Sequence, residues 1–146
     1  MTVEIRLLGR EDGAILHHVA PDVFDFPIVP RWSSEFFDDP RHHLVVALDG
    51  ELVVGFASGV HYVHPDKPPE LWINEVGVAP THHRQGIGRR LLAALLDHGA
   101  SLGCVQAWVL TSPANTSARA LYAGAGGREA PEHSTMFEFS LDPGSG

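Results

Sequence analysis

The segment from Arg84 to Arg90 has residue types suited to binding a phosphate group. It reads Arg-Gln-Gly-Ile-Gly-Arg-Arg, and it lies between an apolar strand and an amphipathic helix. Arginines at a helix N-terminus are unfavourable because that end carries partial positive charge. A bound anion, held by free backbone N–H groups, removes the conflict. The pattern predicts an anion site, although an ordinary strand-to-helix turn with surface arginines has the same sequence.

Two glycines, Gly86 and Gly88, lie within this turn, but neither common nucleotide motif is complete. A P-loop requires a Gly-Lys-Ser/Thr ending, which is absent from the chain. A dinucleotide-binding fingerprint requires a third glycine where Leu91 stands. What remains is a short turn whose glycines let the backbone approach a bound group closely.

The acidic residue Glu75 interrupts an apolar strand predicted over Leu71–Val78. We expect a central strand of this kind to be buried on both faces. A buried carboxylate needs a partner or a chemical role, and burial would raise its pKa toward the range of a general base. Gly77, two residues on, indicates a bulge or a close backbone approach. A salt bridge to an arginine or an edge position would also explain Glu75.

Asn115 and Tyr122 are seven residues apart in a predicted helix, so they share one of its faces. A polar contact to a ligand and a proton-donating hydroxyl could therefore act on one side. Two structural explanations remain open. Asn115 could cap the helix, and Tyr122 could lie at the edge of the core.

The elements that position these residues follow from apolar periodicity and turn signals. Asp49-Gly50 predicts a hairpin. Early hairpins followed by helices predict a mixed sheet covered by helices, with a right-handed parallel crossover after residue 78. Residues 1–142 form one domain, and 143–146 are expected to be a disordered tail. The predicted strands cover residues 3–8, 44–48, 51–62, 71–78, 105–110 and 135–141, and the predicted helices cover 10–19, 32–37, 86–102 and 115–125.

Composition narrows the classes of function. The net charge of −8 argues against a nucleic-acid partner and suits a cationic substrate. No apolar run resembles a signal peptide or a membrane span, and the single cysteine, Cys104, fits a reducing cytoplasm. The ten histidines include adjacent pairs whose rings point apart, without an HExxH pattern, so no metal site is expected.

Together these segments resemble the GCN5-related N-acetyltransferase (GNAT) superfamily, most specifically from Trp72 to Gly127. In that family, a Gln/Arg-x-x-Gly-x-Gly/Ala turn binds the pyrophosphate of acetyl-CoA through backbone amides. The segment His83–Gly88 is similar, with histidine where glutamine or arginine is usual. The resemblance implies a mixed, mostly antiparallel α/β sheet of six to seven strands. The sheet would be splayed between strands four and five and flanked by about four helices.

The resemblance also implies the roles of individual residues. Acetyl-CoA would be the co-substrate, with its pantetheine arm paired like an extra strand near Val76 and Val78. Glu75 would be the general base, and Tyr122 would protonate the departing thiolate, by direct attack in a ternary complex. The implied cofactor-binding residues are Val76, Gly77, Val78, His83, Arg84, Gln85, Gly86, Ile87, Gly88, Arg89, Asn115 and Tyr122.

Within the superfamily the chain looks most like the short aminoglycoside 3-N-acetyltransferases. The resemblance lies in Asp22-Val23-Phe24, the Trp72–Val78 strand and the ending Met136–Pro143. It implies a small cationic amine substrate near Asp22, Asp25, Glu35 and Glu75, within a mouth to which Asp38, Asp39 and Glu70 could also contribute. A protein, peptide or polyamine acetyltransferase and a non-catalytic acyl-CoA-binding module are the alternatives. A homodimer is compatible with all of them.

Overall fold

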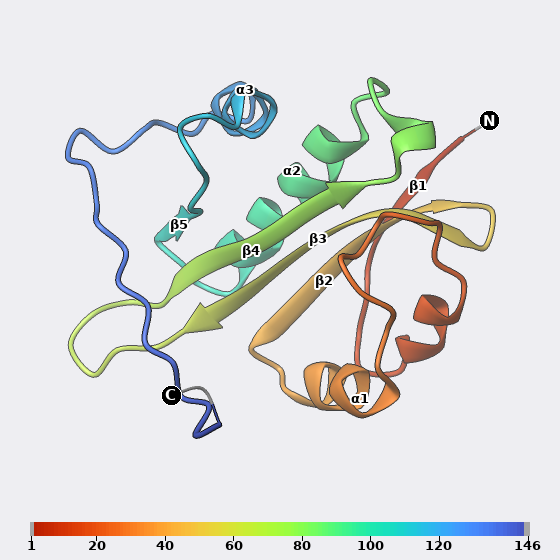
Figure 1. Ribbon diagram of the computed structural model, residues 1–146, viewed down its shortest axis with the longest axis horizontal. Helices are drawn as coiled ribbons and strands as arrows, with labels where there is room; N and C mark the ends of the chain where they lie inside the picture. The colour runs from red at the N-terminus through yellow and green to blue at the C-terminus, as the bar shows by residue number, and fades with distance from the viewer. Residues whose placement is uncertain (1, 145–146) are drawn as a thin grey trace.

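The computed structural model describes residues 2–144 as one five-stranded sheet with helices on both sides (Figure 1). The strands follow the order β1-β2-β3-β4-β5, antiparallel except for the parallel pair β4 and β5. Within the described chain, no helix is long and apolar enough to cross a bilayer. The strands are β1 (Glu4–Leu7), β2 (His42–Asp49), β3 (Leu52–Tyr62), β4 (Glu70–Val78) and β5 (Gln106–Trp108). The helices are α1 (Pro30–Asp38), α2 (Ile87–Ser101) and α3 (Thr116–Gly124), with short 3-10 turns η1 (Gly13–His17) and η2 (Pro80–His82).

The hydrophobic core lies between the sheet and α2, which runs behind the strands in Figure 1. The apolar stripe of α2 fills this layer, and Leu91 and Leu95 are fully buried. A helix leucine buried in this way contributes about 1.5–3 kcal/mol of transfer free energy. Gly99 lets α2 approach β4 closely, because a Cβ there would lie 2.8 Å from the Leu71 side chain. The helix thus holds β4 in a fixed position.

A β-bulge at Asn74 reverses the alternation of side chains along β4. Ser58 lies opposite Glu75, whereas the next residue of β3, Gly59, lies opposite Ile73. One extra residue in one strand has this effect on pairing. Before the bulge, Leu71 and Ile73 face α2, and after it Val76 and Val78 do so.

The strands β4 and β5 separate soon after they begin. They pair only over Glu70–Trp72 and Gln106–Trp108. Beyond Trp72, the outer edge of β4 has no strand partner among the described residues. The expected parallel crossover is confirmed, and the separation leaves an opening beside the second half of β4.

Three expectations about the elements are wrong. The sheet has five strands rather than six to seven, because residues 135–141 pair with no strand within the described part of the chain. Their alternating apolar side chains, including Phe137 and Phe139, are exposed. The alternating pattern therefore does not correspond to a strand with one face packed on the core. Among residues 2–144 there are three α-helices rather than about four, since residues 10–19 form only η1. There the Asp12 carboxylate accepts the Gly9 N–H at 2.7 Å, a local turn that competes with a helix.

The expected tail at 143–146 falls partly outside the described residues, which end at Gly144. The N–H of Gly144 donates to the Asp142 carboxylate at 2.9 Å. The assignment of residues 1–142 to one domain stays a prediction.

Candidate active site

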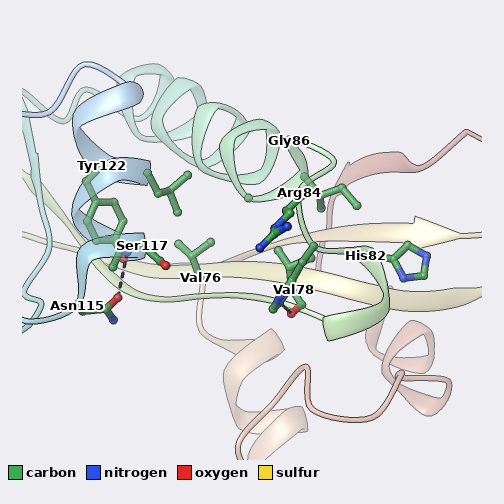
Figure 2. Close-up of a pocket in the computed structure, with 13 residues that line it drawn as sticks. Val76, Val78, His82, Arg84, Gly86, Asn115, Ser117 and Tyr122 are labelled. Atoms are coloured by element: carbon green, nitrogen blue, oxygen red, sulfur yellow. Dashed lines mark hydrogen bonds between the residues drawn. The ribbon is translucent and has the colours of Figure 1, made fainter.

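A cavity of about 540 Å³ lies between β4, the start of α2 and the inner side of α3 (Figure 2). It brings together residues from both segments that the sequence singled out. The expected residues that line it are Val76, Val78, His83, Arg84, Gly86, Ile87, Gly88, Asn115 and Tyr122. Sequence reasoning missed His82, Ser117, Ala118 and Leu121, of which the last three are helical neighbours of Asn115 and Tyr122.

The turn before α2 leaves several backbone N–H groups free to hold an anion. Gly86 is the N-cap residue in a left-handed conformation (φ 73°), and it supplies no capping side chain. The first helical bond runs from the Arg90 N–H to the Gly86 carbonyl, so the preceding helical N–H groups have no acceptor within the helix. Arg84 also has a positive φ (62°), which is uncommon for a residue with a side chain. The cavity therefore has a helix N-terminus beside one arginine.

The other two arginines of the motif have structural positions. The Arg90 guanidinium donates to the Val3 carbonyl at 2.9 Å and so ties the start of the chain to α2. The guanidinium of Arg89 lies against Gly124 of α3. Of the three arginines, only Arg84 lines the cavity, so the sequence argument overcounted the cations available to an anion.

Two consecutive histidines attach the turn to the sheet. The Nε2 of His82 lies 2.8 Å from the Asp49 carboxylate in the β2–β3 turn, and both side chains are largely buried. The Nε2–H of His83 donates to the Val78 carbonyl at 2.8 Å. The turn is thus held against the end of β4 on one side and against the β2–β3 hairpin on the other.

Besides Arg89, two further expected cofactor-binding residues lie away from the cavity, Gly77 and Gln85. A Cβ on Gly77 would point to the opposite face of β4 and meet the Val23 carbonyl at 2.8 Å. The side chain of Gln85 is exposed and is not part of the cavity lining. Gly77 therefore allows the segment before α1 to cross β4 closely, as its position in a strand predicted.

The helix α3 contributes a cap and a hydroxyl. The Asn115 side-chain oxygen accepts the Ala118 N–H at 3.0 Å, so the capping role is confirmed. Its amide NH₂ group is not used by the cap. Tyr122 is half-buried at the other end of the cavity wall, and burial raises the pKa of its hydroxyl. The Tyr122 hydroxyl therefore stays protonated at neutral pH and can act as a proton donor.

Glu75 lies on the face of β4 opposite the cavity. It is exposed rather than buried, and no ion pair joins it to a cation within residues 2–144. The expectation that β4 is buried on both faces is wrong, because this end of the sheet has no covering helix on the Glu75 side (Figure 1). Partial burial raises the pKa of Glu75, and the nearby charge of Asp25 raises it further.

The expected acidic mouth is smaller than the sequence indicated. Asp38 pairs with Arg10 at 3.4 Å, Asp39 with Arg41 at 3.3 Å, and Glu70 with His64 at 3.1 Å. Asp22 and Glu35 are exposed, and Asp22 has a left-handed backbone (φ 64°). Among these carboxylates, Asp25 is the one whose charge affects Glu75.

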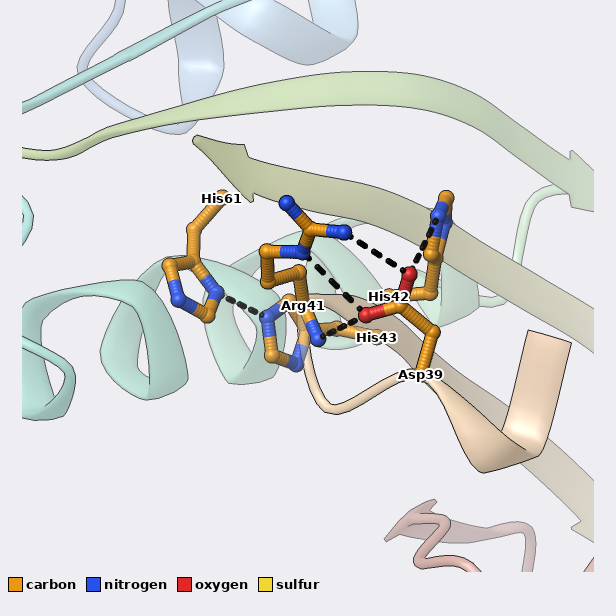
Figure 3. Close-up of polar contacts among 5 residues, drawn as sticks. All are labelled: Asp39, Arg41, His42, His43 and His61. Atoms are coloured by element: carbon orange, nitrogen blue, oxygen red, sulfur yellow. Dashed lines mark hydrogen bonds and ion pairs between the residues drawn. The ribbon is translucent and has the colours of Figure 1, made fainter. Parts of the chain in front are cut away.

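A second polar cluster lies under α2, away from the cavity (Figure 3). His43 is buried, and its ring contacts His61 at 2.7 Å and His98 at 3.0 Å. Burial first, and then the neighbouring histidines, lower the pKa of His43 to about 4. Among the described residues, no group of three or more His, Cys, Asp or Glu is arranged to hold a metal ion.

Comparison with known proteins identifies the family. The Acetyltransferase (GNAT) family matches residues 14–126. The chain belongs to this family. It is 34% identical over 126 residues to the N-alpha-acetyltransferase RimI of Mycobacterium tuberculosis, covering 85% of this chain and 77% of that protein. It is also 33% identical over 92 residues to L-2,4-diaminobutyric acid acetyltransferase of Nocardia farcinica, covering 63% of this chain and 45% of that protein.

Solved structures share the fold of this GNAT chain. An aminoglycoside acetyltransferase from an uncultured soil metagenomic sample superposes with a TM-score of 0.79 at 21% identity, covering 97% of this chain and all of that one. AAC(6′)-Iy, solved with a CoA-based bisubstrate analogue, gives a TM-score of 0.77 at 19% identity, covering 96% of this chain and 99% of the other. These likenesses do not bear out the 3-N subgroup specifically, because the neighbour named by position is a 6′ enzyme.

Membership of the family makes this GNAT chain an N-acetyltransferase that uses acetyl-CoA as co-substrate. The cavity suits such a molecule on physical grounds. Free N–H groups and Arg84 lie at one end for phosphate, and Val76, Val78 and Leu121 supply apolar walls along the middle.

Proposed function

We propose that this acetyltransferase acetylates a primary amine of a small cationic substrate, with Glu75 as general base and Tyr122 as general acid. The observation that supports it is the position of these two residues on opposite sides of β4, along the part of the strand that β5 leaves unpaired. Tyr122 lines the cavity, Glu75 lies on the far face of β4, and β5 leaves β4 after Trp72. Donor and acceptor would approach the opening from opposite faces.

On the donor side, acetyl-CoA supplies the acetyl group as a thioester. The pyrophosphate would lie against the turn from Arg84 to Gly88, where free N–H groups and one guanidinium favour negative charge. Val76 and Val78 would contact the pantetheine arm along the unpaired edge of β4. This places the reacting end of the molecule toward Tyr122.

On the acceptor side, the amine must lose a proton before it can attack. An amine with an ordinary lysine-like pKa is neutral in only about one molecule in 2,500 at pH 7. Glu75 would remove the proton, directly or through a water molecule. Its raised pKa brings it closer to the working pH, where a general base is most effective.

Charge that develops during the transfer also needs stabilisation. A backbone N–H of β4 beside the opening would donate to the oxyanion, as preorganised donors do in acyl-transfer sites. The Tyr122 hydroxyl would return a proton to the departing thiolate. No covalent acetyl-enzyme is required, since the amine attacks the thioester directly.

The net charge of −8 and the Asp25–Glu75 pair support a cationic acceptor. Aminoglycosides are the first candidates, because the solved structures that share the fold include aminoglycoside acetyltransferases. Which amino group would react, 3-N or 6′, is a further question within this proposal. A cytoplasmic location follows as an expectation from the single, half-buried Cys104 and the use of acetyl-CoA.

A second candidate is acetylation of a protein N-terminus. The observation that favours it is the 34% identity to RimI over most of both chains. Trp72 and Glu75 are exposed on one face of β4, and this face would also admit an extended peptide.

A thiol-release assay with acetyl-CoA tests the proposal against aminoglycosides, diamines, diaminobutyrate and short peptides with a free N-terminus. We expect release with the multiply charged amines and little with peptides that carry no other cation. Release with peptides alone would favour the second candidate. Tight acetyl-CoA binding without release for any amine would contradict both candidates and favour a non-catalytic binding module.

A further inference from the structure

Three aromatic residues form a patch where β4 and β5 begin, and the reaction described above does not use them. Tyr62, Trp72 and Trp108 are here called the aromatic patch. The two indole rings stack with centroids 5.3 Å apart and an interplanar angle of 11°. The Trp108 indole N–H donates to the Tyr62 hydroxyl at 2.7 Å, which fixes the ring orientation. Trp72 is nevertheless 39% exposed, a large area for an indole held so rigidly.

The bulge at Asn74 places the patch on the same face of β4 as Glu75. Trp72 lies opposite Val60 and Glu75 lies opposite Ser58, and residues paired in this way share a face. Since Ser58 and Val60 are two apart in β3, their side chains point the same way. Without the bulge, two residues three apart would point to opposite faces. The separation along the strand is about 7 Å, because the two residues of β3 that they face are two apart at 3.3 Å per residue and the extra residue of the bulge adds little length.

The chemistry of this face suits a cation. The faces of tryptophan rings attract ammonium groups more strongly than those of other aromatic side chains. Glu70 adds a carboxylate beside the patch, because it lies opposite Tyr62 in the register, although His64 shares it at 3.1 Å. No lysine or arginine forms an ion pair with Glu70 or Glu75 among the described residues. The strip from Trp72 to Glu75 is thus aromatic and acidic, and continuous with the candidate active site.

We propose that the aromatic patch binds a second ammonium group of the acceptor, at least about 7 Å from the amine that reacts at Glu75. The inference rests on the proposed function and deepens it, since it selects extended diamines and oligoamines within the class of amine substrates. A diamine as short as diaminoethane cannot reach the patch while its other nitrogen lies at Glu75. A monoamine of any length lacks the group that the patch recognises.

The kinetic test compares linear amines of different length and charge at saturating acetyl-CoA. We expect kcat/KM for diaminooctane to exceed that for diaminoethane at least fivefold, mainly through KM. Octylamine, which has the same chain as diaminooctane with one charge, should resemble diaminoethane. Equal kcat/KM for octylamine and diaminooctane would show that the patch recognises an apolar chain, and equal values for all three amines would show that it recognises nothing. Either result overturns the proposal.

Variants locate the effect in the patch. Trp72→Leu should lower kcat/KM for diaminooctane about fivefold or more and leave diaminoethane unchanged, whereas Trp72→Phe should retain part of the preference. Trp32→Leu is the matched control, because it removes another exposed indole, on α1, that is 60% exposed and outside the patch. Loss of the length preference in Trp32→Leu but not in Trp72→Leu would contradict the assignment.

A binding measurement separates this inference from the proposed function. The chain has three tryptophans, so three indole N–H resonances can be assigned from single substitutions. Millimolar diaminooctane should shift the Trp72 and Trp108 signals and leave that of Trp32 in place, while octylamine should shift none. If these shifts occur but no amine is acetylated, the reaction is wrong and the cation site stands. If amines are acetylated and the patch signals do not move, the site is wrong and the reaction stands.

Discussion

The His83 ring donates to the carbonyl of Val78, 2.8 Å away, at the edge of β4 that has no strand partner. The resemblance to the family places the pantetheine arm along this same edge. If the arm binds there, the ring would compete with it for this backbone acceptor. The resemblance implies glutamine or arginine at this position, where this chain has His83.

His83→Ala should bind acetyl-CoA about two- to tenfold more tightly, because one competing hydrogen bond is worth about 0.5–1.5 kcal/mol. Calorimetric titration measures the change. His82→Ala is the comparison variant and should bind more weakly, since His82 attaches the turn to Asp49. Weaker binding in His83→Ala would show instead that the ring holds the turn in its binding conformation.

Gly86→Val should weaken acetyl-CoA binding, because a β-branched residue at φ 73° is strained by about 1–3 kcal/mol. A Cβ at Gly86 meets nothing within 4 Å, so the effect comes from the backbone rather than from a clash. Gly103→Val is the matched control: Gly103 also has a positive φ (87°) and open space, but it lies at the far end of α2. Both variants should lose stability, and only Gly86→Val should lose affinity. Unchanged affinity in Gly86→Val would contradict the pyrophosphate assignment.

Glu75→Gln should lower kcat by about 10²–10⁴, the usual contribution of a general base. Its acetyl-CoA affinity should stay close to that of the unmodified protein, because Glu75 lies on the other face of β4 from the cavity. Steady-state kinetics and a parallel titration separate the two effects. Normal turnover would remove Glu75 from the role of base.

The pH profile of kcat/KM should report the pKa of Glu75. A base must be ionised, so activity falls as pH falls through that pKa. Burial and the charge of Asp25 raise the pKa, so this limb should lie above the ordinary carboxyl value of about 4.3. Asp25→Asn removes one cause and should move the limb to lower pH. A limb that stays in place would show that Asp25 does not act on the base.

Stability should fall in mild acid because of His43. Its pKa in the folded protein is about 4, below the ordinary value near 6.5, so the unfolded chain binds the proton more readily. The contribution of neutral His43 to the free energy of unfolding is fully present above about pH 6.5 and is lost as the pH falls toward 4. Denaturant midpoints measured across this range test the prediction, and His43→Leu should give a flatter profile. The groups facing His43 are His61, His98, His42 and, more distantly, Asp39.

Local patterns were enough to predict the strongest elements. The Asp49-Gly50 hairpin, the helix after Gly86 and the parallel strand after it are confirmed, because each depends on periodicity and turn residues within a short window. The turn at Arg84–Gly88 was found for the same reason. The contacts of Arg89 and Arg90 could not be predicted from local sequence, since they are made with α3 and with the start of the chain.

The bulge at Asn74 was the main feature that periodicity missed. Asn74 and Glu75 were interpreted as two polar residues in a buried strand, whereas one of them is the extra residue of an altered register. Two adjacent polar residues between apolar runs were the available signal. The prediction of a strand at 135–141 was wrong for a related reason. A strand needs the edge of another strand to pair with, and β5, with three residues, provides only a short one.

Deletion of Asn74 alone would restore strict alternation. The side chains of β4 after this position would then point to the opposite faces of the sheet. Val76 and Val78 would then point to solvent. The carboxylate at position 75 would lie on the face of the sheet where acetyl-CoA is proposed to bind. In the proposed reaction, a single inserted residue thus keeps the two reactants on opposite faces of one strand. An insertion or deletion at the bulge of β4 would therefore be far more damaging than a substitution.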